Sequence, residues 1–407
     1  MRATAQVDDL LRELAPQVLA ALLRRYGDFD MCEDAVQEAL LAAAIQWPRD
    51  GIPNNPKGWL ITVAFRRRTE RWRSDTARRR REEAAALIVP PDPEPVPAID
   101  DTITLLLLCC HPSLTPVSQV ALTLRAVGGL RTDEIARAFL VPDATMGQRI
   151  SRAKKTIESR AAEFTMPPPA ELSERMVAVL RVLYLIFNEG HTASSGPSLQ
   201  RIDLTTEAIR LTRQVREGLP DDGEVAGLLA LMLLTDARRP ARVAPDGRLI
   251  PLSEQDRTLW DSGAIAEGVD LITDALSDSV IGPYQLQAAI AAVHDETPSF
   301  DKTDWPQILA LYRLLDEIAP GPMVTLNRIV AVAMVHGAET GLGELAEAEL
   351  DPVLARHHRV EAVRAHLLEF KGDLEAAQAS YRLAARRTLS LPEQRYLDDR
   401  AARLECR

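Results

Sequence analysis

Two proline-rich stretches limit how this chain of 407 residues can fold. The stretch VPPDPEPVPAID at 89–100 cannot form a helix or a central strand, because proline lacks the backbone N–H donor and restricts the residue before it. MPPPAELSE at 166–174 places its prolines directly before a new helical pattern. We therefore predict three segments, at about 1–82, 100–165 and 170–407, in keeping with the two or three domains that the length favours.

The composition predicts an all-α protein. Alanine, leucine and arginine are abundant and β-branched runs are scarce, in a chain with 46% hydrophobic and 26% charged residues. The four cysteines are too few and too unevenly placed for a disulfide framework. The N-terminus lacks a basic start followed by an apolar run, and no stretch approaches the ~18 apolar residues of a membrane span. We therefore expect a cytoplasmic protein that does not contact a membrane.

Charge is distributed unevenly along the chain. The net charge is -11, and residues 166–407 alone carry -12. RRRTERWRSDTARRRR at 66–81 sets nine arginines against two acids, a local charge of +7. Arginines that displace counterions from phosphates supply most nonspecific affinity for nucleic acid. The N-terminal part is therefore a candidate polyanion-binding region, and the acidity belongs to the C-terminal part.

The first segment contains an amphipathic helix in EDAVQEALLAAAIQW. Apolar residues recur at helical spacing on the face predicted to be buried: Val36, Ala39, Leu40 and Ala43. The opposite side combines acids with aliphatic residues: Asp34, Glu38, Leu41 and Ile45. This stripe is either a second packed face or a docking surface for a partner helix.

The second segment contains GLRTDEIARAFLVPDATMGQRISRAKKTI at 129–157, which reads as helix, turn, helix. On the second helix one face is apolar: Met146, Ile150, Ala153 and Ile157. Gln148, Arg152 and Lys155 point the other way, with Arg149 and Ser151 at the margins. Arginine and glutamine read base edges, and basic residues hold phosphates. A solvated surface helix is the alternative; the tight spacing favours DNA binding.

The third segment has a helical pattern almost throughout. In RVAPDGRLIPL, Asp246 and Gly247 between apolar residues signal a short hairpin turn. GDLEAAQASYRLAA places Ala377, Tyr381 and Ala384 at the offsets of the second helix of a tetratricopeptide unit. This single repeat predicts stacked helix pairs without indicating a long array.

Taken together, these motifs resemble one protein family. DAVQEAL followed by NPKGWLITVAFRRR resembles region 2 of the extracytoplasmic-function (ECF) sigma factors of bacterial RNA polymerase. The segment from TPVSQVALTLRAVGGL to SRAKKTI resembles their region 4. With LYLIFNEGHTASSG and the terminal repeat, the chain resembles the group that carries a large helical extension with tetratricopeptide-like repeats.

The resemblance implies a division into region 2 at 1–82, a proline-rich linker at 83–99, region 4 at 100–165 and an extension at 170–407. It implies a noncatalytic subunit that binds core RNA polymerase and promoter DNA. The surface that binds the polymerase would contain Asp34, Gln37, Glu38 and Leu41. In such an interface the leucine is buried, and the acids set partner choice.

Two sets of DNA-binding residues follow from the same resemblance. The promoter -10 element would be bound by Trp59, Arg66, Arg67, Arg68, Arg71 and Trp72. The -35 element would be read by Thr145, Gln148, Arg149, Arg152 and Lys155. Aromatic faces stack on unpaired bases at ~1–3 kcal/mol each, although Trp72 packed in the core is the alternative. Arg66 stands where many members of the family carry Asn.

Other patterns do not support a catalytic or metal site. Adjacent cysteines in CCHP (109–112) cannot easily ligate one tetrahedral metal, so we expect buried thiols and no metal. FNEGHTAS at 187–194 lacks a nucleophile elbow and is interpreted as a helix end with a polar turn, or as a small-molecule or partner pocket. No phosphate-binding glycine loop is present, so no cofactor and no enzyme activity are expected.

Two other classes of protein compete with the sigma factor. One is a helix-turn-helix transcriptional regulator with a ligand- or partner-sensing helical C-terminal domain, which would need no polymerase-binding helix. The other is a C-terminal enzyme with a DNA-binding appendage. The acidic extension is expected either to contact the sigma regions within the molecule and modulate their accessibility, or to have a purely structural role.

Overall fold

The computed structural model describes residues 2–82, 101–139, 141–159, 164–194, 196–351, 354 and 358–405. For residues 70–82 and a few others within helices it describes the backbone alone. The described residues form helices, short 3₁₀ turns and two isolated β-bridges, with no β-strand among them, which confirms the all-α prediction. The chain divides into two compact units, Met1–Leu183 and Tyr184–Arg407. None of the described helices combines the length and the apolar character of a membrane span.

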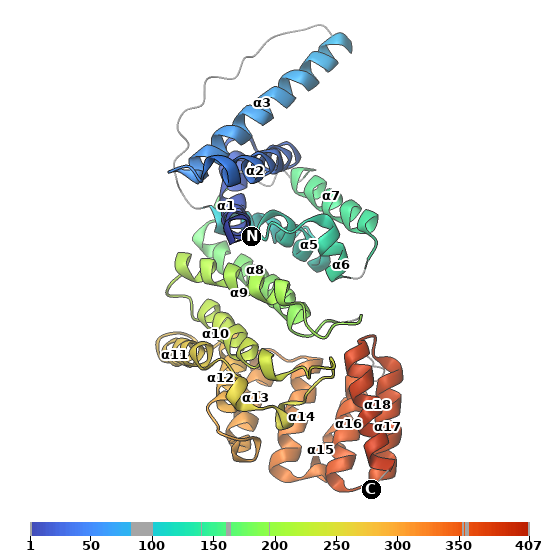
Figure 1. Ribbon diagram of the computed structural model, residues 1–407. Coiled ribbons are helices and arrows are strands. Elements are labelled where there is room, and N and C mark those ends of the chain that lie inside the picture. Colours follow the sequence, from blue (N-terminus) through green and yellow to red (C-terminus); the bar gives the residue numbers. More distant parts are fainter. Residues whose placement is uncertain are drawn as a thin grey trace. The chain divides into compact units, whose positions relative to one another are not determined.

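Unit 1 contains the helices α1 to α3, the helices α4 to α7 and the first part of α8 (Figure 1). The elements are α1 (Arg2–Tyr26), α2 (Phe29–Asp50), α3 (Pro56–Glu82), α4 (Thr102–Cys109), α5 (Pro116–Ala126), α6 (Thr132–Ala138), α7 (Asp143–Ser159) and α8 (Pro169–His191). The boundary between the units falls inside α8, so its first part belongs to unit 1. The proline-rich linker predicted at 83–99 lies outside the described residues.

The first three helices pack around a shared apolar core. Leu22 of α1, Phe29 of α2 and Leu60 of α3 are each at most 1% exposed. The side chain of Asp28 accepts a hydrogen bond from Met31 N at 3.0 Å and caps the start of α2. Tyr26 and Phe65 meet edge to face, with ring centroids 5.5 Å apart, where α1 approaches α3. The three helices therefore hold the outer face of α2 in a fixed orientation.

The segment at 101–159, which contains the helix-turn-helix, packs directly against α1 and α2. The α4 run Leu105–Leu108 is buried on every side, and α4 contacts both α5 and α1. A short helix that is apolar all round must be covered by neighbours on all its faces. Residues 1–82 and 101–159 consequently belong to one compact unit, although the sequence predicted them as separate segments.

Unit 2 is a succession of packed helices, each contacting the next along the chain (Figure 1). After the end of α8, its α-helices are α9 (Ile202–Gly218), α10 (Gly223–Ala237), α11 (Ser262–Asp278), α12 (Pro283–Asp295), α13 (Trp305–Ile318), α14 (Pro322–His336), α15 (Ala338–Ala348), α16 (His358–Lys371), α17 (Leu374–Arg387) and α18 (Leu391–Glu405). Its 3₁₀ turns are η1 (Arg239–Ala241), η2 (Leu252–Glu254), η3 (Arg257–Leu259) and η4 (Phe300–Lys302).

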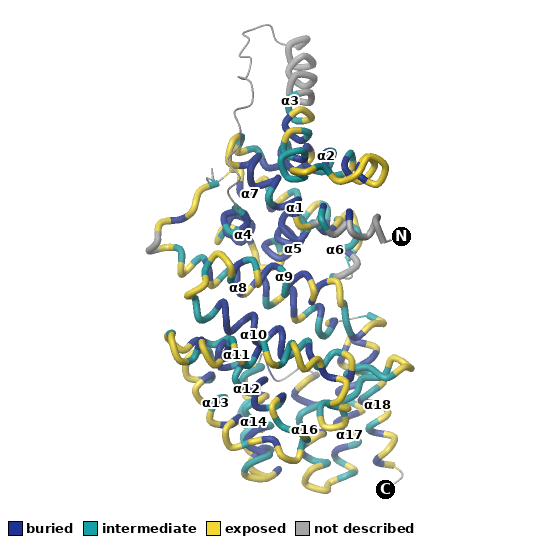
Figure 2. The backbone as a smooth tube through the Cα atoms, turned by 60° about the vertical axis from the view of Figure 1, so that its left-hand side comes forward, coloured by how far each residue is buried: buried dark blue, intermediate teal, exposed yellow. Residues whose placement is uncertain are grey.

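Helix α10 lies at the centre of the first half of unit 2. It packs on α9, α11 and α12, and Figure 2 shows it as mostly buried. Gly227 permits the close approach to α12, because a Cβ there would lie 2.7 Å from the backbone nitrogen of Gln285. The predicted hairpin turn follows: Ala244 N donates to Arg248 O at 2.9 Å, and Gly247 adopts a positive φ of 82°.

The C-terminal helices α16, α17 and α18 pack in sequence, with α17 in the middle. Ala377, Tyr381 and Ala384 of α17 are buried, as the repeat pattern predicted, and they share an apolar cluster with Ala365 of α16 and Leu397 of α18. Alanines at these positions let neighbouring helices pack closely. This arrangement agrees with stacked helix pairs.

Candidate functional site

The outer face of α2 presents the predicted stripe of acids and aliphatic residues. Asp34 is exposed, Gln37 and Glu38 are half-buried, and Leu41 and Ile45 are 63% and 52% exposed. On the inner face, the predicted core residues Val36, Ala39 and Ala43 are buried, and Leu40 is half-buried. Exposed large aliphatic side chains beside acids on one helix face are typical of an interaction surface.

The start of α3 lies beside this stripe. Trp59 is half-buried and meets Trp47 edge to face, with ring centroids 5.6 Å apart. Arg66 and Arg67 are exposed, and Arg67 Nε lies 3.8 Å from Glu38 Oε2 on α2. The predicted polymerase-binding and -10-binding surfaces are therefore adjacent and share an ion pair.

The remaining predicted -10 residues differ in their surroundings. The guanidinium of Arg68 lies over the ring of Tyr26, 3.5 Å from its centroid, and the side chain is half-buried. This cation–π contact gives Arg68 a packing role between α3 and α1. Arg71 and Trp72 are on α3, but their side chains lie outside the described residues, as do those of the arginines at 78–81.

Helices α6 and α7 form the predicted helix-turn-helix, joined by the turn around Pro142. The four apolar residues of α7 are buried: Met146, Ile150, Ala153 and Ile157. Four of the predicted -35 residues are exposed on the opposite face: Thr145, Gln148, Arg152 and Lys155. Arg149 is half-buried at the margin. The helix therefore offers amide, hydroxyl and basic groups along one accessible face, which is the chemistry that reads a DNA groove.

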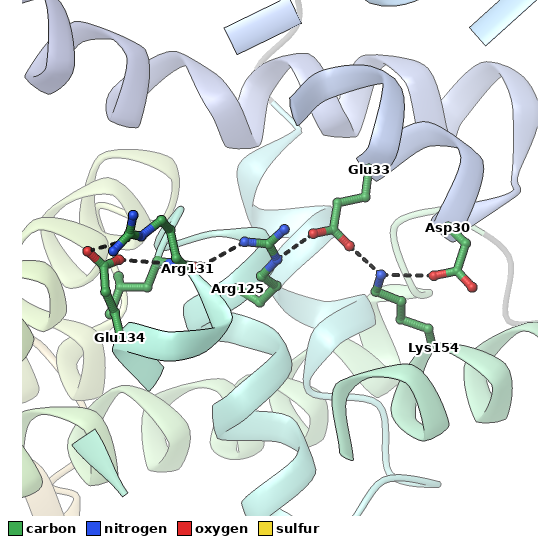
Figure 3. A network of polar contacts seen from close by, with 7 residues as sticks. Asp30, Glu33, Arg125, Arg131, Glu134 and Lys154 are labelled. Atoms are coloured by element: carbon green, nitrogen blue, oxygen red, sulfur yellow. Dashed lines mark hydrogen bonds and ion pairs between the residues drawn. The ribbon is translucent and has the colours of Figure 1, made fainter. Parts of the chain in front are cut away.

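A buried ion cluster joins α2 to the helix-turn-helix segment (Figure 3). The carboxylate of Glu33 is 4% exposed; its Oε1 accepts from Arg125 Nε at 2.5 Å and its Oε2 pairs with Lys154 Nζ. Lys154 Nζ also donates to Asp30 Oδ1 at 2.8 Å. Burial alone would lower the pKa of Lys154, but Glu33 and Asp30 raise it above its ordinary value.

Arg125 extends the cluster toward α6. Its Nη1 donates to the carbonyl of Leu130 at 3.2 Å, just before Arg131, whose backbone nitrogen donates to Glu134 at 2.8 Å. The N-terminus of α6 is thus tied to the same arginine that binds Glu33 on α2 (Figure 3). Arg125 therefore contacts both α2 and the start of α6, and Lys154 of α7 adds a second attachment to α2.

Sequence reasoning did not identify this cluster. Glu33 lies 92 residues from Arg125 along the chain, so no local pattern relates the two. One signal was present: Glu33 stands three residues before Val36, on the side of α2 predicted to be buried. A buried carboxylate requires a cationic partner, but its identity depends on tertiary packing.

The two patterns set aside as noncatalytic have distinct surroundings. Cys109 and Cys110 are buried free thiols; burial raises the pKa of Cys110 to about 12 and that of Cys109 well above its ordinary value. Among the described residues, no cluster of potential ligands could hold a metal ion. Cys406 lies outside the described residues.

FNEGHTAS forms the end of α8 and the turn after it. The carboxylate of Glu189 accepts hydrogen bonds from the backbone nitrogen and Oγ of Ser194, at 3.2 and 3.3 Å. Burial raises the pKa of Glu189, against these hydrogen bonds. Asn188, Glu189, His191 and Ser194 all line one cavity of unit 2, with a volume of about 880 Å³.

Comparisons with known proteins match three parts of the chain. Residues 10–79 match sigma-70 region 2, residues 104–157 match sigma-70 region 4, and residues 175–276 match a family of unknown function, DUF6596. The uncharacterized protein R00370 of Rhizobium meliloti (strain 1021) is 39% identical over 350 residues, which cover 84% of this chain and 83% of that protein. No solved structure matches the chain significantly.

Replacing the buried carboxylate, Glu33→Gln, should weaken the attachment of α7 to α2. Arg125 and Lys154 would keep their charges without the carboxylate between them, and breaking a buried ion pair costs about 3–5 kcal/mol. Spin labels at the exposed positions Gln46 and Ser159, in a Cys406→Ser background, would report the distance between α2 and α7. We expect a longer and broader distance distribution in the variant.

The matched control is Asp50→Asn, an exposed carboxylate at the other end of α2. It should keep the distances of the unchanged protein. Equal distance distributions for Glu33→Gln and the control would show that Glu33 does not hold the two helices together.

Proposed function

The chain belongs to the sigma-70 family of transcription initiation factors, with regions 2 and 4 followed by a helical extension, and we propose that it is an extracytoplasmic-function member whose extension modulates its activity. The observation that carries the proposal is the pair of accessible surfaces in unit 1, the stripe on α2 and the polar face of α7. A helix-turn-helix regulator needs the second surface but not the first. The tetratricopeptide-like character of α16–α18 is part of the proposal, supported by the buried alanines of α17.

The α2 stripe is proposed to bind core RNA polymerase through Asp34, Gln37, Glu38 and Leu41. Leu41 supplies apolar area at the centre of the contact, and the acids around it select a basic partner surface. Glu38 has a second role, because its contact with Arg67 brings the polymerase-binding face to the start of the -10 surface.

The -10 element is proposed to bind around Trp59, Arg66 and Arg67, together with Arg68, Arg71 and Trp72. The exposed arginines would follow the phosphate backbone of the separated strands, and aromatic faces would stack on unpaired bases. The face of α7 carrying Gln148 and Arg152 would enter the major groove at the -35 element, with Thr145, Arg149 and Lys155 at its edges.

The contacts that α3 and α7 make with α2 lie close together in unit 1. Asp30, which binds Lys154 of α7, and Glu38, which contacts Arg67 of α3, are about 12 Å apart along α2. The -10 and -35 elements are separate stretches of the promoter, so the two surfaces that bind them have to act at different places along the DNA. We therefore propose that α7 leaves α2 when the protein engages polymerase and promoter, breaking the Glu33 ion pairs.

The double substitution Asp34→Arg with Leu41→Arg reverses one charge on the α2 stripe and introduces another. It should weaken binding to core polymerase at least tenfold. The change removes the apolar contact and opposes a basic partner surface. Glu38 is left in place because of its contact with Arg67. Binding is measured by fluorescence anisotropy of labelled protein titrated with core polymerase, after circular dichroism has shown an unchanged helix content.

The control for this experiment is Asp50→Arg, which changes charge on α2 outside the stripe. Undiminished binding of the double variant would remove the docking assignment from this face of the helix.

On the DNA side, Arg152→Ala should weaken protection of the -35 element by the holoenzyme about 5- to 150-fold, which corresponds to the ~1–3 kcal/mol of a bidentate base contact. If Arg152 holds only a phosphate, the salt dependence of binding becomes shallower instead. Arg131→Ala serves as the control, because this exposed arginine precedes α6 and lies off the α7 face. Identical protection by the two variants would contradict a DNA-reading role for this part of α7.

A chain that ends after His191 should differ at least threefold from the full chain in promoter-dependent transcription with purified core polymerase. The end of α8 is the appropriate place to stop, because the first part of α8 belongs to unit 1. Activity rises if the extension restricts access to the sigma regions, and falls if assembly requires it. Equal activity from a shortened chain with the expected helix content would favour a purely structural extension.

A further inference from the structure

Unit 2 contains a cavity that the sigma-factor function does not use. Its volume is about 880 Å³, and its lining comes from α8, the end of α10, α12, α13, α14, α16 and α18. Sites for small organic ligands are concave, have volumes of about 300–1,000 Å³, and combine apolar walls with a few polar groups. A lining assembled from so many helices also fixes the position of each polar group relative to the others.

One part of the wall is aromatic and aliphatic. Tyr184 and Tyr312 line the cavity together with Ile290, Leu315 and Val324. The ring of Tyr184 packs on Tyr284, with centroids 5.4 Å apart, and its hydroxyl donates to Gln287 at 3.1 Å. Because these contacts hold the ring in place, it offers a rigid apolar surface at little cost in side-chain entropy.

Another part of the lining carries Arg238 and His294. The side chain of Arg238 is only 13% exposed; its Nε donates to Asp295 Oδ1 at 2.6 Å and its Nη2 to the carbonyl of Ala291 at 2.9 Å. Within the described part of the chain, these bonds leave the N–H groups of Nη1 unused. Nδ1 of His294 is buried and likewise has no hydrogen-bond partner among the described residues.

His191 adds a further donor to the lining. Arg242 Nη1 lies 3.1 Å from His191 Nδ1 and 2.6 Å from its backbone carbonyl. A guanidinium always donates, so Nδ1 of His191 accepts, and the ring proton is on Nε2. The ring also stacks on Phe187, with centroids 5.8 Å apart. These contacts fix both the orientation and the tautomer of His191.

Arg238, Arg242 and Arg257 surround this end, and the carboxylates of Glu189 and Glu393 also line the cavity. Burial, followed by Arg242 and Arg238, holds the pKa of His191 well below its ordinary value, and burial with Arg238 and Arg257 lowers the pKa of His294 to about 3. Burial and Arg238 lower the pKa of Arg242 to about 10, although Asp236 and Glu393 act in the opposite direction. Clustered cations that destabilise one another are stabilised by an anion.

We propose that this cavity binds a small amphipathic organic anion, with its charged group at Arg238 and its apolar part against Tyr184 and Tyr312. A carboxylate, sulfonate or phosphate group accepts hydrogen bonds from the Nη1 group of Arg238 and from His191 Nε2. The recessed position of Arg238 selects a slender ligand over a folded protein surface. The extension thereby has a small-molecule site of its own, and this inference does not depend on polymerase or promoter binding.

Two fluorescent probes of similar shape test the proposal on the full chain: anilinonaphthalene sulfonate, which is anionic, and N-phenylnaphthylamine, which is neutral. The sulfonate should bind at least tenfold more tightly than the amine and should raise the midpoint of thermal unfolding, since a ligand that binds the folded state stabilises it. Equal affinity for the two probes, or binding of the sulfonate without stabilisation, would overturn the anion site.

A filling substitution locates the binding. Gly321 lies on the cavity lining, its φ of -178° is extended, and a Cβ there would meet no atom within 4 Å. Gly321→Phe should therefore fold normally and reduce affinity for the sulfonate at least tenfold. Gly343→Phe is the matched control, since a Cβ at Gly343 also meets open space and Gly343 does not line the cavity. Equal loss, or no loss, in both variants would place the probe elsewhere.

Arg238→Gln tests the charged end separately. It should reduce affinity for the sulfonate at least tenfold and leave binding of the neutral amine within twofold, which also shows that the cavity remains folded. If Arg238→Gln disrupts folding through Asp295, Gly321→Phe and the comparison of the two probes still decide the question. Loss of affinity for both probes in a folded Arg238→Gln variant would contradict the assigned role of the charge.

Discussion

The buried carboxylate of Glu33 is the interaction on which the closed arrangement of unit 1 depends. It receives Arg125 from α5 and Lys154 from α7, and so attaches both helices to α2. A charge that is 4% exposed is tolerated only because two cations neutralise it. Such a cluster contributes little net stability compared with apolar packing. It does favour one arrangement of the helices, because the ion pairs form only when α5 and α7 both lie beside Glu33.

Two different faces of α2 carry the buried ion cluster and the stripe proposed to bind polymerase. Glu33 points inward to region 4, whereas its neighbour Asp34 is exposed on the stripe proposed to bind polymerase. Adjacent residues on a helix are separated by ~100° around the axis, so one short sequence reaches both surfaces. The proposed docking on the outer face and the proposed release of region 4 from the inner face thus involve the same helix. A small shift of α2 would alter the Glu33 ion pairs, because charge-assisted hydrogen bonds depend strongly on distance.

Local patterns in the sequence were sufficient to predict the helices and many of their faces, but not the contacts between distant segments. The apolar face of α7 and the buried residues of α17 follow from helical spacing, which is a property of neighbouring residues. The Glu33 cluster depends on how α5 and α7 pack on α2. The contact of Arg67 with Glu38 and the position of Arg68 over Tyr26 depend on how α1, α2 and α3 pack. For the cavity of unit 2, the polar motif at 187–194 indicated a pocket as one alternative, but the rest of the lining, which extends to Glu393, depends on tertiary packing. The polymerase-binding, -10 and -35 residues stay predictions.

Burying the charged side chains in unit 2 costs desolvation free energy, and the stability of the fold does not explain why they are there. Arg238 and Asp295 form a buried pair at 2.6 Å, with the carboxylate side chain fully covered, and Arg242 and Arg257 add further positive charge nearby. Apolar residues of similar size would stabilise a purely structural helical stack at least as well. Buried charges kept at the edge of a cavity are better explained by a function that requires them there.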